Sequence, residues 1–405
     1  MDKASLDGIR VLDLTQAMAG PMATMLLGDL GAEVIKIEPL TGDQTRKWAP
    51  PYINGMSAYF LSANRNKKSI SMDLKSSRGK EILKKLLQSS DIIIENFRPG
   101  TMERMGFSYD EVSKIRNDII YCSLSGYGQT GPGKDWPGYD LTVLANSGLM
   151  SLNGDPDRAP VKFGVPIADI TSGLFSDIAI LSALYERTKT GRGQYIDMSM
   201  LDSNFLVLTH QAFNYFATGK NPQRLGSVHS SIAPYQVFEA SDGYFALTVG
   251  TDKLWSKFVN AIGRTDLENN PEFNSNVQRV INRERLVSEL SKTFRNYTVK
   301  DLLKKFMDEG IPSAPINSVG DAIDNQQIKA REMVTEMDSP YGRIKMLGTP
   351  FKLSTTPGSL RIPPPQLGGN SVKILESLGY NSEEIASLIK QSVINGQTAV
   401  DEQPK

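Results

Sequence analysis

Asp169 is the residue whose surroundings in the sequence best suit a chemical role. It lies in Pro166-Ile167-Ala168-Asp169-Ile170-Thr171-Ser172-Gly173, directly before a long apolar helical pattern. The chain has one cysteine, Cys122, and two histidines, His210 and His229. A Ser-His-Asp or Cys-His mechanism needs an imidazole beside its nucleophile, and a His/Cys metal site needs several such ligands. The inventory disfavours both, so we expect carboxylate chemistry without a bound metal.

The composition is that of an ordinary globular protein. The chain has 405 residues, of which 40% are hydrophobic and 22% charged, enough for a large core and two domains. Its 45 basic residues balance its 45 acidic residues, so no overall field favours nucleic acid or an anionic membrane. Residues 1–7 lack the apolar core of a signal peptide, and no window approaches the roughly 20 apolar residues of a membrane span. We therefore expect a cytoplasmic protein that does not cross a membrane.

The first 125 residues alternate between strand and helix patterns. The expected strands are residues 9–14, 33–37, 91–95 and 119–123, and the expected helices are residues 21–30, 77–89 and 109–115. Repeated βα units of this kind predict an α/β protein with a doubly wound parallel sheet. The turn after the first strand, residues 15–21, is small but lacks the glycine-rich dinucleotide fingerprint, so NAD is not expected. Its amides could face a phosphate, or the turn could simply pack a helix on a strand.

The rest of the chain divides into further segments. Helices are expected at 170–189 and 201–215, with a strand between them that runs through residue 200. The pattern predicts a large domain over residues 1–215, a linker over 216–230, a small α+β domain over 231–325 and a return segment over 326–405. The small domain should contain a hairpin of strands 235–239 and 244–249 and helices at 253–262, 283–294 and 299–307. Residues 354–365 should run extended before a last helix at 372–378.

Several motifs in order along the chain resemble the class III coenzyme A transferases, a family that also includes the 2-methylacyl-CoA racemases. The matching stretches are Leu6–Asp13, Glu95–Gly100, Arg104–Gly106, Ser125–Gly128, Ala168-Asp169, Lys189–Gln194 and Ile232–Tyr235. The resemblance implies a Rossmann-type large domain that binds CoA, a smaller domain, and a ring-shaped subunit threaded through its partner in an interlocked homodimer.

The resemblance also implies a role for Asp169. In the family, the matching aspartate attacks an acyl-CoA thioester to form a mixed anhydride, and CoA thiolate then returns to give an aspartyl-CoA thioester. A position before a helix would expose Asp169 to the positive end of the dipole and keep it ionised at neutral pH. A residue of this type in this place is also a typical N-cap, and both roles are compatible only if one carboxylate oxygen stays free.

The expected partners are acyl-CoA and small carboxylic acids, with CoA acting as a substrate and no tightly bound cofactor. The resemblance places six residues near CoA: Ala17, Met18, Asn96, Phe97, Arg104 and Met200. Where some members of the family have arginines that face the nucleotide, this chain has Pro39-Leu40. Lys36 and Arg46 are the nearby candidates to replace them.

Tyr139 separates two possible activities. Racemases of the family have a histidine base in this segment, and a tyrosine with its ordinary pKa is a poor proton acceptor at neutral pH. CoA transfer is therefore the leading hypothesis, ahead of racemisation and of CoA binding without turnover. Four residues are candidates for contact with the acids: Gln16, Tyr139, His229 and Tyr235.

Overall fold

The computed structural model describes residues 4–396, which form two compact units. The larger unit contains the chain up to Met150, the segment Lys162–Gly219 and the chain from Gln327 onward. The smaller unit contains Ser151–Val161 and Lys220–Gln326. Residues 151–161, which the sequence division placed in the large domain, thus group with the smaller unit.

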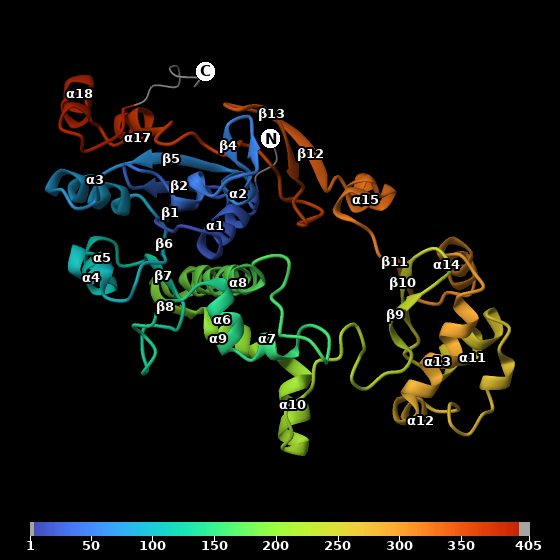
Figure 1. Cartoon of the computed structure of the whole chain (residues 1–405). Coiled ribbons are helices and arrows are strands. Elements are labelled where there is room, and N and C mark those ends of the chain that lie inside the picture. The colour runs from blue at the N-terminus through green and yellow to red at the C-terminus, as the bar shows by residue number, and fades with distance from the viewer. Residues whose placement is uncertain (1–3, 397–405) are drawn as a thin grey trace. The chain divides into compact units, whose positions relative to one another are not determined.

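A six-stranded parallel sheet forms the centre of the larger unit (Figure 1). Its strand order is β5-β2-β1-β6-β7-β8. The strands are β1 (Arg10–Asp13), β2 (Glu33–Glu38), β5 (Lys67–Ser71), β6 (Ile92–Glu95), β7 (Ile120–Ser125) and β8 (Gln194–Ser199). This order reverses between β1 and β6, as in Rossmann-type sheets, whose ligands bind beyond the carboxyl ends of the strands at the reversal. The expected parallel α/β architecture is confirmed.

Helices cover both faces of this sheet because successive strand residues point to opposite sides. Leu12 and Ile93 lie in one core with α3 (Ser77–Gln88), α5 (Tyr109–Ile115), α17 (Ser371–Ser377) and α18 (Ser382–Lys390). Val11 and Ile94 lie in the opposite core with α1 (Ala19–Asp29) and α8 (Ile167–Thr190). The other elements up to residue 218 are η1 (Gln44–Lys47), β3 (Tyr52–Ile53), β4 (Met56–Ser57), α2 (Ala58–Ser62), α4 (Thr101–Met105), α6 (Asp140–Asn146), α7 (Leu149–Leu152), α9 (Met200–Leu206) and α10 (Thr209–Thr218).

A network of buried charges joins β1, β2 and β5. Lys67 Nζ lies 3.0 Å from Asp13 Oδ2, and Lys36 Nζ lies 2.9 Å from Asp43 Oδ2. All four side chains are fully buried. Burial alone would raise the pKa of Asp13, but the two lysines hold it far below its usual range. Lys36 also donates to the Thr15 carbonyl at 2.8 Å, which ties the network to the turn after β1.

Strand β5 was not predicted because its sequence, Lys67-Lys68-Ser69-Ile70-Ser71, has two lysines and one large apolar residue. A buried lysine is tolerated only when it is paired and hydrogen-bonded. Asp13 provides that pairing from a strand more than 50 positions earlier. The contact that makes this segment a strand is therefore invisible in the local sequence.

The smaller unit is a three-stranded antiparallel sheet with helices. It contains the expected hairpin of β9 (Tyr235–Glu239) and β10 (Tyr244–Thr248), extended by β11 (Ser313–Pro315). Six buried phenylalanines lie in its core: Phe238, Phe245, Phe258, Phe273, Phe294 and Phe306. Its helical elements are α11 (Asp252–Ala261), η2 (Thr265–Leu267), α12 (Asn276–Ile281), α13 (Arg283–Phe294), α14 (Val299–Asp308) and α15 (Val319–Asp324).

The C-terminal part of the chain packs on the larger unit (Figure 1). After α16 (Gln326–Ala330), β12 (Val334–Ser339) and β13 (Gly342–Leu347) form a hairpin, and the chain then continues without a helix or strand to α17. Asn66 Oδ1 accepts hydrogen bonds from the amides of Arg361 and Ile362, at 2.7 and 2.9 Å. The helix expected at 372–378 is confirmed as α17, but it is not the last helix, because α18 follows it.

Helix α8 contradicts the expectation that no segment is long and apolar enough to span a membrane. Its 24 residues are long and apolar enough, by length and composition, to cross a membrane. Ile180 and Ala183 of this helix pack in the core beneath β6 and β7. Because a core helix meets the same criteria, α8 by itself assigns no membrane location.

We predict that Asp13→Ala lowers the free energy of unfolding by about 3–5 kcal/mol, because it leaves Lys67 buried without its anion. Urea denaturation measures this change. Glu81→Ala is the control, since it breaks an exposed ion pair of 3.2 Å with Arg78 and should cost at most about 1 kcal/mol. A loss for Asp13→Ala no larger than that of the control would contradict the prediction.

Candidate active site

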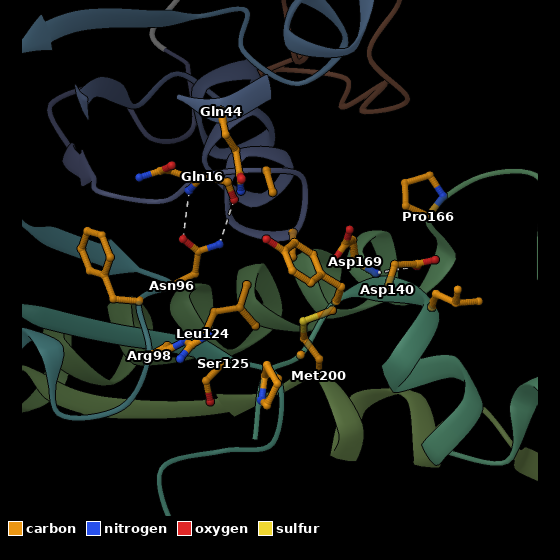
Figure 2. A pocket seen from close by; sticks show the side chains of 18 of the residues that line it. Gln16, Gln44, Asn96, Arg98, Leu124, Ser125, Asp140, Pro166, Asp169 and Met200 are labelled. Carbon is orange, nitrogen blue, oxygen red and sulfur yellow. Dashed lines mark hydrogen bonds between the residues drawn. The ribbon is translucent and has the colours of Figure 1, made fainter. Parts of the chain in front are cut away.

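The larger unit has a cavity of about 680 Å³ beyond the carboxyl ends of β1, β6 and β7 (Figure 2). It lies at the reversal of strand order, where the Rossmann topology predicts a ligand. The sequence-predicted residues that line it are Gln16, Ala17, Asn96, Phe97, Tyr139, Asp169 and Met200. Further lining residues include Gln44, Trp48, Tyr59, Arg98, Lys134, Asp140 and Lys162.

Asn96 holds the turn after β1 against the end of β6. Its Oδ1 accepts from the Gln16 amide at 2.9 Å, and its Nδ2 donates to the Gln16 carbonyl at 2.8 Å (Figure 2). Ala17, the next residue, has a left-handed backbone with φ of 67°, which is uncommon for a residue with a side chain. The paired hydrogen bonds fix this turn, so the Gln16 side chain faces the cavity.

Asp169 is the third residue of α8 and not the residue before it. Helix α8 begins at Ile167 with Pro166 at its N-cap position, and the N-cap interpretation of Asp169 was therefore wrong. The cap comes from Asp140, whose Oδ1 accepts from the amides of Ala168 at 2.8 Å and Asp169 at 3.4 Å. Within residues 4–396 the Asp169 carboxylate accepts no hydrogen bond, so both of its oxygens are available to a ligand.

Burial raises the pKa of Asp169 to about 7, and the negative charge of Asp140 acts in the same direction. The expectation that Asp169 stays ionised at neutral pH rested on the positive end of the helix dipole; burial and the like charge of Asp140 act against that ionisation. Burial also raises the pKa of Tyr59 to about 12, with Asp169 and Asp140 adding to the shift. Tyr59 is therefore a neutral hydroxyl donor in the cavity at pH 7.

Three exposed cations line the cavity: Arg98, Lys134 and Lys162. None of them forms an ion pair within the described part of the chain, so they are available to anionic groups of a ligand. Lys36 and Arg46, the candidates named from sequence, are not available in this way. Lys36 is fully buried against Asp43, and Arg46 is buried and bonded to Glu38 at 2.7 Å.

Four predicted residues do not line the cavity. Met18 is buried at the N-cap of α1, and Arg104 in α4 donates to Thr101 Oγ1 at 3.0 Å. His229 and Tyr235 belong to the smaller unit, where their rings stack with centroids 5.0 Å apart. Sequence reasoning missed Asp140, although it adjoins Tyr139 in a segment already selected. Trp48 and Tyr59 carried no local signal, since single aromatic residues outside a motif usually pack in a core.

Neither a metal site nor the single cysteine offers an alternative chemistry at this position among the described residues. Among residues 4–396, no group of three His, Cys, Asp or Glu side chains could hold a metal ion. Cys122 lies fully buried in β7, and burial raises the pKa of its thiol well above its usual range. A buried thiol of this kind is inert as a nucleophile.

Comparison with known proteins identifies the family of the chain. The model of CoA-transferase family III matches residues 6–371. The chain is 42% identical over 392 residues to succinyl-CoA:glutarate CoA-transferase of Mus musculus, covering 96% of this chain and 90% of that protein. It is 39% identical over 354 residues to acetyl-CoA:oxalate CoA-transferase of Acetobacter aceti, covering 87% and 90%. The crystal structure of a CAIB/BAIF family protein from Brucella suis superposes with a TM-score of 0.83 at 40% identity, covering 93% of this chain and 100% of that one.

The chain therefore belongs to CoA-transferase family III. It is an enzyme of the class that moves CoA between an acyl-CoA and an acid.

The raised pKa of Asp169 predicts how its contribution to stability depends on pH. The unfolded chain ionises Asp169 near its usual value of 3.8 and the folded protein only near 7. Stability is thus lost as pH rises from about 4 to 7 and stays constant above that range. Asp169→Asn removes this loss, so its thermal midpoint should match that of the natural protein at pH 4 and exceed it at pH 8. The raised pKa of Asp169 would be contradicted if the variant and the natural protein differed in thermal midpoint by the same amount at pH 4 and at pH 8.

Proposed function

We propose that the enzyme transfers CoA from an acyl-CoA donor to a carboxylic acid through covalent intermediates on Asp169. The observation that carries this proposal is a carboxylate that accepts no hydrogen bond from any residue between 4 and 396, held in the first turn of a helix inside the cavity. Such a group keeps its lone pairs for a substrate carbonyl.

The first exchange divides into two steps. An oxygen of ionised Asp169 attacks the donor thioester carbonyl, the carbon–sulfur bond breaks, and CoA leaves as a thiolate while a mixed anhydride forms on the enzyme. The thiolate then attacks the aspartyl carbonyl and expels the donor acid as a carboxylate. The product is an aspartyl-CoA thioester.

The acceptor acid reverses the sequence. Its carboxylate attacks the carbonyl of the aspartyl thioester and forms a second anhydride with Asp169. CoA leaves as a thiolate in this step. The thiolate attacks the acceptor's acyl carbonyl, and the new acyl-CoA leaves as Asp169 returns to a carboxylate. Each proton or electron pair is accounted for within substrate, CoA and Asp169, so no further cofactor enters these steps.

We propose short dicarboxylic acids as the acid substrates. Relatives at 42% and 39% identity are named for glutarate and oxalate transfer. The cavity that holds Asp169 also presents Arg98, Lys134 and Lys162, whose charges suit the phosphates of CoA and a second carboxylate. Tyr139 also lines the cavity where the racemases have their histidine base, which supports transfer over racemisation.

Asp169→Ala should bind CoA as the natural enzyme does while losing transfer by at least about 1,000-fold, because it removes the covalent nucleophile. Mass spectrometry of CoA exchange between succinyl-CoA and glutarate measures transfer, and borohydride trapping with the donor should label Asp169. Asp202→Asn is the control, since it changes another first-turn aspartate that does not line the cavity. Full transfer by Asp169→Ala would contradict the mechanism, and rapid α-deuterium incorporation into a 2-methylacyl-CoA without transfer would favour racemisation.

We also propose that the enzyme is a homodimer, with the interlocked rings that its family resemblance implies. Helix α10 has no buried residue in the single chain, and its Phe213 and Phe216 are 71% and 68% exposed with ring centroids 5.6 Å apart. Ile178 and Tyr185 of α8 are 62% and 66% exposed. Large apolar side chains gathered in this way are typical of a protein interface.

Mass photometry at nanomolar protein should therefore show a particle of twice the 44.6 kDa chain mass that dissociates only as the protein unfolds. Phe213→Asp with Phe216→Asp should lower the thermal midpoint by placing charges in the interface. Ile281→Asp is the matched control, because Ile281 is 70% exposed in the smaller unit. A folded monomer that is stable on dilution would contradict the proposal.

A further inference from the structure

The start of helix α8 is completed by a residue from another helix. The first four amides of a helix have no partner within it, and a Ser, Thr, Asp or Asn side chain at the N-cap usually supplies one. Here that position is Pro166, which has no acceptor in its side chain. Asp140, the first residue of α6, instead accepts from the amides of Ala168 and Asp169 (Figure 2).

Of the other two amides of this turn, one is bonded to the preceding segment and the other makes the first i to i−4 bond of the helix. The Ile167 amide donates to the Val165 carbonyl at 2.8 Å, and the Ile170 amide donates to the Pro166 carbonyl at 3.0 Å. All four amides are thus satisfied without any contribution from the Asp169 side chain. An aspartate in the first turn would otherwise be free to fold back on these amides, and the bond from Asp140 removes that competition.

Asp140 also sets the charge around Asp169. It lines the same cavity, and its negative charge raises the pKa of Asp169, after the larger effect of burial. Lys162, from the segment before α8, partly offsets the charge of Asp140, and Tyr59, from α2, is neutral at pH 7. Asp140 thus binds backbone amides, while Asp169 beside it keeps its carboxylate free for a substrate.

From this geometry we infer that Asp140 is a positioning residue for the transfer reaction: it fixes the backbone that carries Asp169 and leaves the Asp169 carboxylate free for the substrate. The inference rests on the proposed role of Asp169 as nucleophile. Acylation turns Asp169 into an uncharged group and ends its repulsion with Asp140. The charge of Asp140 therefore favours the acylated enzyme over the free carboxylate.

Two substitutions separate the hydrogen bonds from the charge. Asp140→Asn keeps an oxygen that can accept from the Ala168 and Asp169 amides but removes the charge. Asp140→Ala removes both. Asp110→Asn is the matched control, because Asp110 lies in the first turn of α5, is exposed and does not line this cavity.

The experiment measures the pH dependence of kcat/KM for succinyl-CoA and of borohydride-trapped adduct on Asp169, with the thermal midpoint of each variant. We expect the ionisation near pH 7 to move down by about half to one pH unit in Asp140→Asn. We expect Asp140→Ala to show that shift and also a fall in kcat of about 10- to 100-fold, with KM for succinyl-CoA changed less than about threefold. Asp110→Asn should match the natural enzyme.

Two outcomes would overturn the inference, and they differ in what else they affect. If the natural enzyme forms the adduct on Asp169 but both Asp140 variants keep its pH profile and kcat, Asp140 has no positioning role and the proposed function stands. If the natural enzyme forms no adduct on Asp169, the proposed function and the inference fail together. Because Asp140→Asn preserves the acceptor, the pH test holds even if Asp140→Ala is unstable.

Discussion

The buried ion pair between Asp13 and Lys67 is the interaction on which the larger unit depends. It allows a lysine strand, β5, to enter the sheet, and it lies at the carboxyl end of β1, directly before the turn that borders the cavity. Two charges inside a protein interior are tolerated only because each has a partner and further hydrogen bonds. Lys36 extends the network to the Thr15 carbonyl, so the same charges that join the strands also fix the first loop of the site.

Hydrogen bonds then carry this order from the sheet to the reacting group. Asn96 fixes Gln16 from the end of β6, and Asp140 fixes the first turn of α8 from the start of α6. Both contacts join a side chain to backbone from a different part of the chain. Because these two residues hold the backbone, the Asp169 carboxylate is not used to cap the helix. The cavity thus separates the residues that hold its shape from the residue that reacts.

Electrostatics distinguishes this cavity from an ordinary surface cleft. Burial and Asp140 raise the pKa of Asp169 to about 7, whereas Asp13, buried more deeply, is held far below its usual pKa by lysines. The two carboxylates differ in their partners: Asp13 has the ammonium of Lys67 at 3.0 Å, whereas Asp169 has a second carboxylate nearby. The cations of the cavity, such as Lys162, are exposed and make no ion pair within the described chain, which suits an anionic substrate.

The sequence by itself determined the parallel α/β class, the family resemblance and the choice of Asp169, because apolar periodicity and motifs are local properties of the chain. Only the tertiary structure showed that Lys67 belongs to a strand, that Lys36 and Arg46 are buried in ion pairs, and that Asp140 rather than Asp169 caps α8. Each of these depends on which group a charged side chain meets in the fold, whether that group is 7 positions away, as Asp43 is from Lys36, or 54, as Asp13 is from Lys67. Whether a charged side chain is free, paired or shifted in pKa is set by burial and by neighbours that only folding brings together.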